Sequence, residues 1–461
     1  MFLSINPVDG TEFARYAPTS PADVDAALDA AIAAQKVWRR QPMTVRAAAL
    51  RRLAKLLRAR KDTFAALITM EMGKPIVEAE GEIEKSAWTC DFYAEHAARF
   101  LADEIVPSNA SESRVVFDPL GVVLAVMPWN YPFWQYFRFL APALAAGNGA
   151  ILKHAANVPG CAMAIEDIMQ ESGLPNGLSR VLLIESSRVG DLIADDRIAA
   201  VTLTGSTAVG QIVAAQAGKH LKKQVLELGG TDPFIVLADA DIALAAQVGV
   251  RARFQNVGQS CIAAKRFIVE EKVADAYIAA FNEHVRALKV GDPMDRATQI
   301  GPLARIDLRD GLHDQVDRCV SEGARVAIGG EKLPGTGAYY APTVLDGVLP
   351  EMTACREEIF GPVAQILRAP DAETAIAIAN DSEYGLGAAL WTSDITRAHA
   401  LAHDIEAGAV FINGMVASDA RVPFGGIKKS GYGRELGVYG IREFTNIKTV
   451  WVGPAQAVPA N

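Results

Sequence analysis

Residues 149–184 read GAILKHAANVPGCAMAIEDIMQESGLPNGLSRVLLI. Short apolar runs at 149–153 and 180–184 predict two strands, and the apolar spacing of three and four residues over 157–172 predicts a helix between them. Two parallel strands need a crossover connection of this kind. The stretch therefore predicts a parallel sheet with helices on its faces, which is an α/β fold.

The same alternation continues along the chain. Runs at 200–204 and 224–228 predict further strands, with a helix over 206–220 between them. A second series begins near residue 232, and no Pro/Ser-rich linker separates the two series, so we expect two domains that share a cleft. The second series predicts strands at 234–237, 266–269, 362–367, 388–392 and 409–413, and helices over 274–288 and 307–322.

The flanks of these two series follow other patterns. Apolar residues at helical spacing predict helices over 21–38, 44–71 and 85–101. β-branched runs at 113–118 and 121–127 predict strands around a turn. The final run, at 448–452, lies far from both series, and such a strand often pairs with a sheet edge, including that of another subunit.

Composition excludes several classes of function. The 461 residues carry 45 Lys and Arg against 54 Asp and Glu, a net charge of −9, so the surface repels nucleic acid. No apolar run approaches the roughly 18 residues that span a bilayer, and the N-terminus lacks a signal-peptide pattern. The five cysteines are widely spaced without CxxC or metal-ligand spacing, which favours a reduced cytoplasmic compartment and no metal.

One cysteine stands out from the rest. Cys261 ends the stretch GQSC (258–261) between a predicted helix and a predicted strand, and Gly258 and Ser260 permit a tight turn that exposes a side chain. A nucleophilic thiolate is one interpretation; a small structural cysteine is the other, and by base rate the commoner one. No histidine has a local context that suggests a Cys–His pair.

A donor for an oxyanion follows the strand at 121–127. Asn130 lies in PWNYP (128–132), at the carboxyl end of a predicted parallel strand, where ligands bind. Its neutral amide suits an oxyanion hole, and a helix N-cap or a turn asparagine is the alternative. In the helix expected after it, Trp134 and Arg138 share a face. We expect one of two roles for Arg138. It either binds a carboxylate of the substrate, or it is a structural arginine that pairs with a core acid or stacks on Trp134.

A carboxylate ends another predicted strand. Glu227 begins ELGG (227–230), and an unpaired buried carboxylate is costly, so its placement favours a general base whose pKa is raised by partial burial. A buried salt bridge to Lys or Arg is the alternative. The two glycines allow another segment or a ligand to approach closely.

A possible nucleotide site precedes it. Gly205 and Ser206 lie in TGSTAVG (204–210), at a strand-to-helix junction whose backbone N–H groups can hold a phosphate, or where Ser206 is a plain N-cap. Lys153, at the end of its strand, can reach ribose or phosphate. No acid follows it, since the next residues are His154, Ala155 and Ala156, so a 2′-phosphate is not repelled and NADP is acceptable.

Together and in this order, these motifs resemble the aldehyde dehydrogenase superfamily over nearly the whole chain. The resemblance adds EEIFGP (357–362), PFGG (423–426) and KSG (429–431). It implies two Rossmann-type parallel-sheet domains plus a small β arm for oligomerisation. The expected parts are a dinucleotide-binding domain at 1–110 and 125–231, a catalytic domain at 232–425, and the arm at 111–124 and 440–461.

The resemblance also implies a role for each residue. Cys261 would be the nucleophile, Asn130 would help to hold the oxyanion, and Glu227 would activate the water that releases the product. The cofactor, NADP or NAD, would be contacted by Trp129, Lys153, Ala156, Gly205, Ser206, Glu358 and Phe360.

The finer resemblance is to short bacterial succinate-semialdehyde dehydrogenases. It rests on 127–140, 152–159 and 258–266, and it implies a substrate site made of Trp134, Arg138, Ser260 and Ser418. The expected reaction oxidises succinic semialdehyde in a homodimer or a dimer-of-dimers tetramer. Other semialdehydes, broad specificity, CoA-acylating chemistry and a non-catalytic protein with this fold are the alternatives; Glu227 argues against CoA acylation, which needs no water-activating base.

Overall fold

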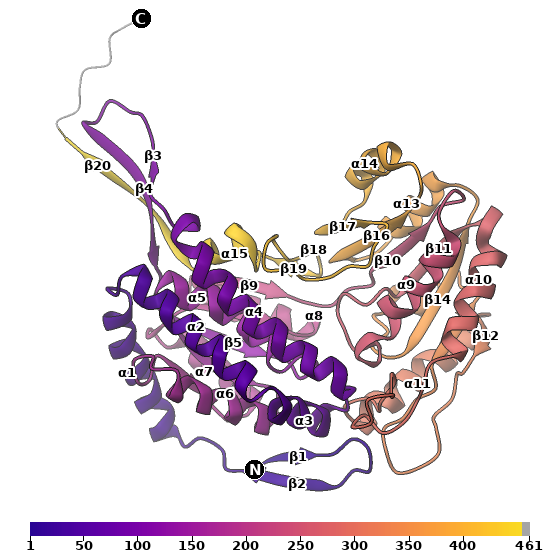
Figure 1. Ribbon diagram of the computed structural model, residues 1–461, viewed down its shortest axis with the longest axis horizontal. Coiled ribbons are helices and arrows are strands. Elements are labelled where there is room, and N and C mark those ends of the chain that lie inside the picture. The colour runs from indigo at the N-terminus through magenta and orange to yellow at the C-terminus, as the bar shows by residue number, and fades with distance from the viewer. Residues whose placement is uncertain (454–461) are drawn as a thin grey trace, which may run out of the picture.

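The computed structural model describes residues 1–453 (Figure 1). The last part of the predicted arm, residues 454–461, lies outside the described residues. Two α/β lobes lie side by side, and a narrow β arm projects from the N-terminal lobe.

The N-terminal lobe is built on a six-stranded sheet with the order β19-β9-β8-β5-β6-β7. The five strands from β5 to β9 run parallel, and β19 is antiparallel to β9. The parallel sheet predicted from residues 149–184 is thereby confirmed. The strands are β5 (Val122–Met127), β6 (Gly149–His154), β7 (Ser179–Val181), β8 (Ile198–Thr204), β9 (Lys223–Glu227) and β19 (Gly431–Tyr432).

Both faces of this sheet are covered, which explains why its strands are apolar throughout. Along β5, Val122 and Leu124 face a core with α1, α7 and α8, whereas Val123 and Ala125 face a core with α2 to α6. The period-two alternation of a strand thus feeds two separate cores. The helices are α1 (Pro21–Trp38), α2 (Met43–Ala59), α3 (Lys61–Met72), α4 (Ile76–Phe100), α5 (Trp134–Ala146), α6 (Pro159–Glu171), α7 (Val189–Ala194) and α8 (Thr207–Lys219).

Two predicted helix boundaries in this lobe were wrong. The single helix expected over 44–71 is two helices, because Arg60 leaves the helical region (φ −112°, ψ 16°). The helix expected from Lys85 begins at Ile76, directly after Pro75. A proline suits the boundary before a helix, and the four glutamates between residues 78 and 84 hid this start from an apolar pattern.

The C-terminal lobe contains a seven-stranded sheet with the order β12-β13-β14-β11-β10-β16-β17. All its pairs are parallel except β12 with β13. Phe234 and Val236 of β10 face α9 and α10, and Ile235 faces α11, α13 and α14. The elements are β10 (Pro233–Val236), α9 (Ile242–Phe254), β11 (Arg266–Glu270), α10 (Glu271–Arg286), α11 (Ile306–Ser321), β12 (Arg325–Ile328), β13 (Thr343–Asp346), α12 (Thr353–Arg356), β14 (Val363–Ala369), α13 (Ala372–Asn380), β16 (Gly387–Trp391), α14 (Ile395–Asp404) and β17 (Ala409–Ile412).

The arm joins two distant parts of the chain. β4 (Glu112–Pro119) pairs antiparallel with β20 (Thr445–Val452) and with β3 (Glu104–Ile105). The predicted final strand therefore pairs with a strand of its own chain, and its Ile447 and Trp451 side chains are exposed. The small remaining elements are β1 (Phe2–Ile5), β2 (Glu12–Tyr16), β15 (Tyr384–Gly385), β18 (Ile427–Lys428), α15 (Gly437–Glu443) and two 3₁₀ turns (Ser186–Arg188 and Gln255–Gly258).

Over residues 1–453, none of the helices has both the length and the apolarity required to cross a membrane. The same residues contain no cluster of three or more His, Cys, Asp or Glu side chains that could hold a metal ion.

Candidate active site

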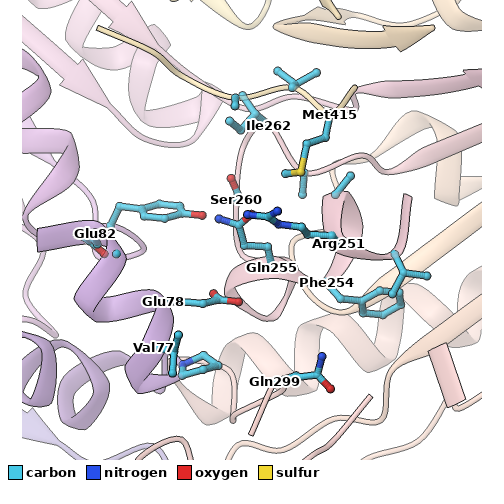
Figure 2. A pocket seen from close by; sticks show the side chains of 18 of the residues that line it. Val77, Glu78, Glu82, Arg251, Phe254, Gln255, Ser260, Ile262, Gln299 and Met415 are labelled. Atoms are coloured by element: carbon cyan, nitrogen blue, oxygen red, sulfur yellow. The ribbon is translucent and has the colours of Figure 1, made fainter. Parts of the chain in front are cut away.

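A cavity of about 1030 Å³ is lined by residues from both lobes. Figure 2 shows Glu78 and Glu82 entering from α4 on one side and Arg251 and Phe254 from the end of α9 on the other, with Ser260 between them. The predicted site residues that line this cavity are Trp134, Arg138, Ser260, Cys261 and Ser418. The structure thus brings together residues that are up to 284 positions apart (418 − 134).

The loop that carries Cys261 has an unusual backbone. After α9, Asn256 and Val257 have φ values of 55° and 57°, and Gly258 follows at 70°. A left-handed backbone is costly for a β-branched residue, by about 1–3 kcal/mol, and such strain is typical of functional sites. The loop is held by hydrogen bonds: Asn256 Nδ2 donates to the Gln259 carbonyl (2.9 Å), and Lys265 Nζ donates to the Cys261 carbonyl (2.8 Å).

Cys261 differs from the other cysteines in exposure. All five cysteines are free, but only Cys261 is partly exposed and lines the cavity. Burial of the thiol raises its pKa to about 12, while the positive charges of Arg138 and Lys265 oppose that shift. The side chain is therefore a protonated thiol at rest, and ionisation at this site depends on nearby cations.

Asn130 is hydrogen-bonded to the loop that carries Cys261. Its Nδ2 donates to the Gln259 carbonyl (3.0 Å), and its Oδ1 accepts from Gln135 Nε2 (3.0 Å). The N-cap alternative is not what the structure shows, because α5 begins at Trp134 after Phe133 and has no side-chain cap from Asn130. Instead, Glu82 of α4 accepts from the N–H groups of Phe133 and Trp134 (2.8 and 3.0 Å) and so fixes the start of α5.

Glu227 ends β9 and is 2% exposed. Both of its carboxylate oxygens lack a hydrogen-bond partner, and within residues 1–453 it forms no salt bridge, so the predicted alternative of a buried ion pair is not observed. Burial raises its pKa well above the ordinary value, and the like charge of Glu435 adds to that shift. An unpartnered buried carboxylate is typical of a general base.

Glu227 is near the nucleophile loop although it does not line the cavity. A Cβ added to Gly230 would lie 2.9 Å from the Cys261 carbonyl oxygen, so the two backbones touch there. Consecutive Cα atoms are about 3.8 Å apart, so the Glu227 Cα is within about 11 Å of the Gly230 Cα. The glycine pair after Glu227 therefore provides the close approach that the sequence predicted.

Arg138 is paired inside the protein. Its guanidinium forms an ion pair with Glu435, donates to Thr204 Oγ1 (3.1 Å) and lies 4.8 Å from the Phe424 ring centroid. Both groups of the ion pair are buried. The alternative of a structural arginine with a core acid is therefore observed, while Arg138 also lines the cavity. Its role as a substrate anchor stays a prediction.

The residues predicted to contact a dinucleotide surround the carboxyl ends of the N-terminal sheet. The rings of Trp129 and Phe360 meet edge to face at 5.9 Å. Glu358 accepts from the Gly230 N–H (3.1 Å) and lies 3.2 Å from Lys265 Nζ. A Cβ at Gly229 would collide with that carboxylate, so a larger residue there would displace the Glu358 side chain.

Ser206 and Lys153, the residues predicted to meet phosphate and ribose, lie at or next to the ends of two strands of the N-terminal sheet. Ser206 caps α8 after Gly205, so the first N–H groups of a 13-residue helix are presented there. Lys153 donates to Ser186 Oγ (3.1 Å) and has no ion-pair partner within residues 1–453. Burial lowers its pKa, and the negative charge of Glu185 opposes that shift. Ala156 is exposed near this end of β6. A buried lysine that forms no ion pair within residues 1–453, together with the N-terminus of a 13-residue helix, suits an anionic cofactor.

Sequence reasoning missed several residues of the site. Lys85 and Glu82 lie in an ordinary amphipathic helix, and Glu435 comes from a late loop that carries no motif. Tyr131 and Phe424 lie inside the motifs PWNYP and PFGG, but sequence reasoning assigned neither of them a role. Local sequence offered no signal for Lys85, because a lysine in a Glu-rich helix is usually solvated. The missed residues are Glu82, Lys85, Tyr131, Phe424 and Glu435.

Comparisons with known proteins agree with this geometry. A family model described as "Aldehyde dehydrogenase family" matches residues 1–450. The NAD(P)+ succinate semialdehyde dehydrogenase Sad of Escherichia coli (strain K12) is 51% identical over 449 residues, which cover 97% of each chain. A probable NADP+ succinate-semialdehyde dehydrogenase of Synechocystis sp. is also 51% identical, over 97% of this chain and 99% of that one.

A solved structure extends the likeness to three dimensions. The succinic semialdehyde dehydrogenase from Streptococcus pyogenes, in complex with NADP+, is 36% identical with a TM-score of 0.96, over 98% of this chain and 100% of that chain. A match of this length in sequence and in fold goes well beyond a shared α/β architecture. The chain belongs to the aldehyde dehydrogenase family.

Proposed function

We propose that this protein oxidises succinic semialdehyde to succinate with NAD+ or NADP+ as the hydride acceptor. The observation that supports it most is the cavity, in which the one partly exposed cysteine shares its walls with Trp134, Arg138 and Ser418. The names and the high identity of the bacterial relatives point to the same substrate and cofactors.

In the first step, Cys261 Sγ releases its proton to solvent and attacks the aldehyde carbon as a thiolate. The charges of Arg138 and Lys265 favour the thiolate against its burial. The carbonyl oxygen takes the electron pair, and Asn130 Nδ2 and a backbone N–H stabilise it as neutral donors. The product is a thiohemiacetal on Cys261.

The residues that would hold the cofactor are Lys153 and Ser206 at the phosphate and ribose end and Trp129, Glu358 and Phe360 toward the cavity. The chemistry that a bound nicotinamide supplies is acceptance of a hydride, which turns the thiohemiacetal carbon into a thioester. Ala156 places no charge at the ribose end, so the chain itself does not repel a 2′-phosphate there.

In the last step, Glu227 takes a proton from water, and the hydroxide attacks the thioester carbon. The C–S bond breaks, the acid leaves, and the Cys261 thiolate takes the proton that Glu227 holds. One water is consumed in each cycle. Only the ionised carboxylate can accept the proton, so the raised pKa of Glu227 makes this step faster as the pH rises.

A panel of aldehydes with both cofactors tests the proposal. We expect the highest kcat/KM for succinic semialdehyde, with formation of reduced cofactor followed by absorbance and free succinate as the product. If uncharged aldehydes gave the same kcat/KM as succinic semialdehyde, the enzyme would be a broad-specificity aldehyde dehydrogenase instead. Formation of an acyl-CoA after addition of CoA would indicate acyl transfer instead of hydrolysis.

We also infer a three-part division and an oligomer. The N-terminal sheet would be the cofactor domain, the C-terminal sheet the catalytic domain, and β4 with β20 the oligomerisation arm. Exposed Ile447 and Trp451 on β20 support a homodimer or a dimer of dimers, because exposed apolar strands invite pairing. Light scattering of the purified protein tests this. Five free thiols are compatible with a cytoplasmic location.

A further inference from the structure

Lys85 connects two residues of the predicted substrate site. It lies on α4 and lines the cavity, and its Nζ is 2.7 Å from Ser418 Oγ. The same Nζ lies 4.2 Å from the centroid of the Trp134 ring. The ammonium group is thus held between a hydroxyl from the late loop and an aromatic face from α5, with its stem on the wall of the cavity.

The neighbouring charges already have partners. Arg138 pairs with Glu435, Lys74 pairs with Glu82, and Arg421 pairs with Asp419. Glu82 also accepts hydrogen bonds from the N–H groups at the start of α5. The carboxylates nearest to Lys85 are therefore committed to other groups.

Lys85 itself has no such partner. Within residues 1–453 it forms no ion pair, although it is only partly exposed. Burial lowers its pKa to about 8, and the positive charges of Arg138 and Lys74 contribute, against the charges of Asp419 and Glu82. A buried cation without a counter-ion is costly, and an anion that enters the cavity would relieve that cost.

We propose that Lys85 is a specificity-determining residue that binds the distal carboxylate of the substrate together with Ser418. This assignment rests on the proposed function and names the group that recognises the acid end. Arg138, whose charge is balanced by Glu435, contributes less of the net attraction. Trp134 covers the methylene chain, and Ser418 orients the ammonium group toward the carboxylate.

The test compares an anionic and an uncharged aldehyde of equal carbon number, succinic semialdehyde and butanal. In Lys85→Met, we expect the ratio of KM for succinic semialdehyde to KM for butanal to rise roughly tenfold to a hundredfold, the effect of losing one charge-assisted hydrogen bond. Lys85→Arg should restore most of the preference. Lys55→Met, on the exposed face of α2, is the matched control and should leave both KM values unchanged.

A pH series adds a readout that a purely structural lysine would not move. In the wild type the ratio should rise as the pH passes about 8, because Lys85 then loses its charge. In Lys85→Arg it should stay flat over the same range, since arginine remains protonated. The groups that face Lys85 are Arg138, Asp419, Glu82 and Lys74, and all of them are kept in this variant.

The outcomes separate the two proposals. If the wild type uses butanal as well as succinic semialdehyde, the proposed substrate is wrong. If the wild type prefers the anion but Lys85→Met and a second variant, Lys85→Gln, keep the same KM ratio, only the Lys85 assignment is wrong. A loss shared equally by both aldehydes also overturns it, because a carboxylate anchor acts on the charged substrate alone.

Discussion

Arg138 and Glu435 form a buried ion pair directly beside the unpaired carboxylate of Glu227. One cation thus serves two carboxylates, and its charge also acts on the Cys261 thiol. The pair links the proposed nucleophile and the proposed base electrostatically. A change at either partner should therefore alter both stability and chemistry.

Loss of Arg138 should destabilise the protein strongly. In Arg138→Met, the Glu435 carboxylate stays buried without its partner, which costs about 3–5 kcal/mol in the free energy of unfolding. The double variant Arg138→Met/Glu435→Gln should recover much of that loss, because the buried charge is gone. Urea denaturation measures both. The exposed pair of Arg356 and Asp381 is the control, and Arg356→Met should cost less than about 1 kcal/mol.

A fully stable Arg138→Met variant would show that Glu435 is neutral when buried. Glu435 would then not be the charged partner of Arg138.

Substitution of Glu227 should separate acylation from hydrolysis. In Glu227→Gln we expect a burst of reduced cofactor equal to the enzyme concentration and then turnover slower by about 10²–10⁴-fold, the usual contribution of a general base. Stopped-flow absorbance measures the burst. Glu373→Gln, on an exposed side chain of α13, is the control and should behave as the wild type.

The pH dependence gives an independent check on the same residue. Burial raises the pKa of Glu227, so the hydrolysis rate in the wild type should increase with pH as the carboxylate ionises. This increase should vanish in Glu227→Gln. A variant without a burst, or with the wild-type pH profile, would remove Glu227 from the base role.

Gly258 should be irreplaceable in the nucleophile loop. Its φ is +70°, and a Cβ there would run into the Gly361 carbonyl, so Gly258→Ala should displace Cys261 and lower kcat at least a hundredfold. The control is Gly311→Ala in α11, where nothing lies within 4 Å of the added Cβ. That change should raise the free energy of unfolding by about 0.4–1 kcal/mol. Near-normal kcat in Gly258→Ala would contradict the requirement for this backbone.

A charge at position 156 should change the choice of cofactor. Ala156→Glu places a carboxylate near the ribose end of the proposed cofactor site, which should repel a 2′-phosphate and accept bonds from a 2′-hydroxyl. We expect kcat/KM with NADP+ to fall relative to NAD+ by tenfold or more. Ala59→Glu, at the exposed end of α2, controls for added charge. If the ratio of kcat/KM for NADP+ to that for NAD+ did not change, the ribose of the cofactor would not lie near position 156.

The sequence predicted most of the fold because its signals are local. The apolar runs of β5, β6 and β8 are strand-sized, and Ser20 with Pro21 marks the start of α1 where the structure has it. The break at Arg60 could not be foreseen, since 44–71 keeps helical spacing throughout and packing decides where the chain turns. Pairing of β20 with β4 spans most of the chain, and no local pattern encodes its register.

For the site, residues with chemical motifs could be predicted and their partners could not. The strand ends and glycines mark Asn130, Glu227 and Cys261, because those motifs depend on short-range geometry. The pairing of Arg138 with Glu435, and of Lys85 with Ser418, joins segments about 300 residues apart. A charged side chain in a helix looks solvated until the tertiary structure buries it.

The most direct test of the central claim is the mass of the trapped intermediate. Glu227→Gln is mixed with succinic semialdehyde and NADP+, quenched in acid during the burst and digested. We expect one succinyl group, as a thioester, on the peptide that contains Cys261, and no such adduct in Glu227→Gln/Cys261→Ala. An adduct on another cysteine, or a full burst without any adduct, would contradict that claim.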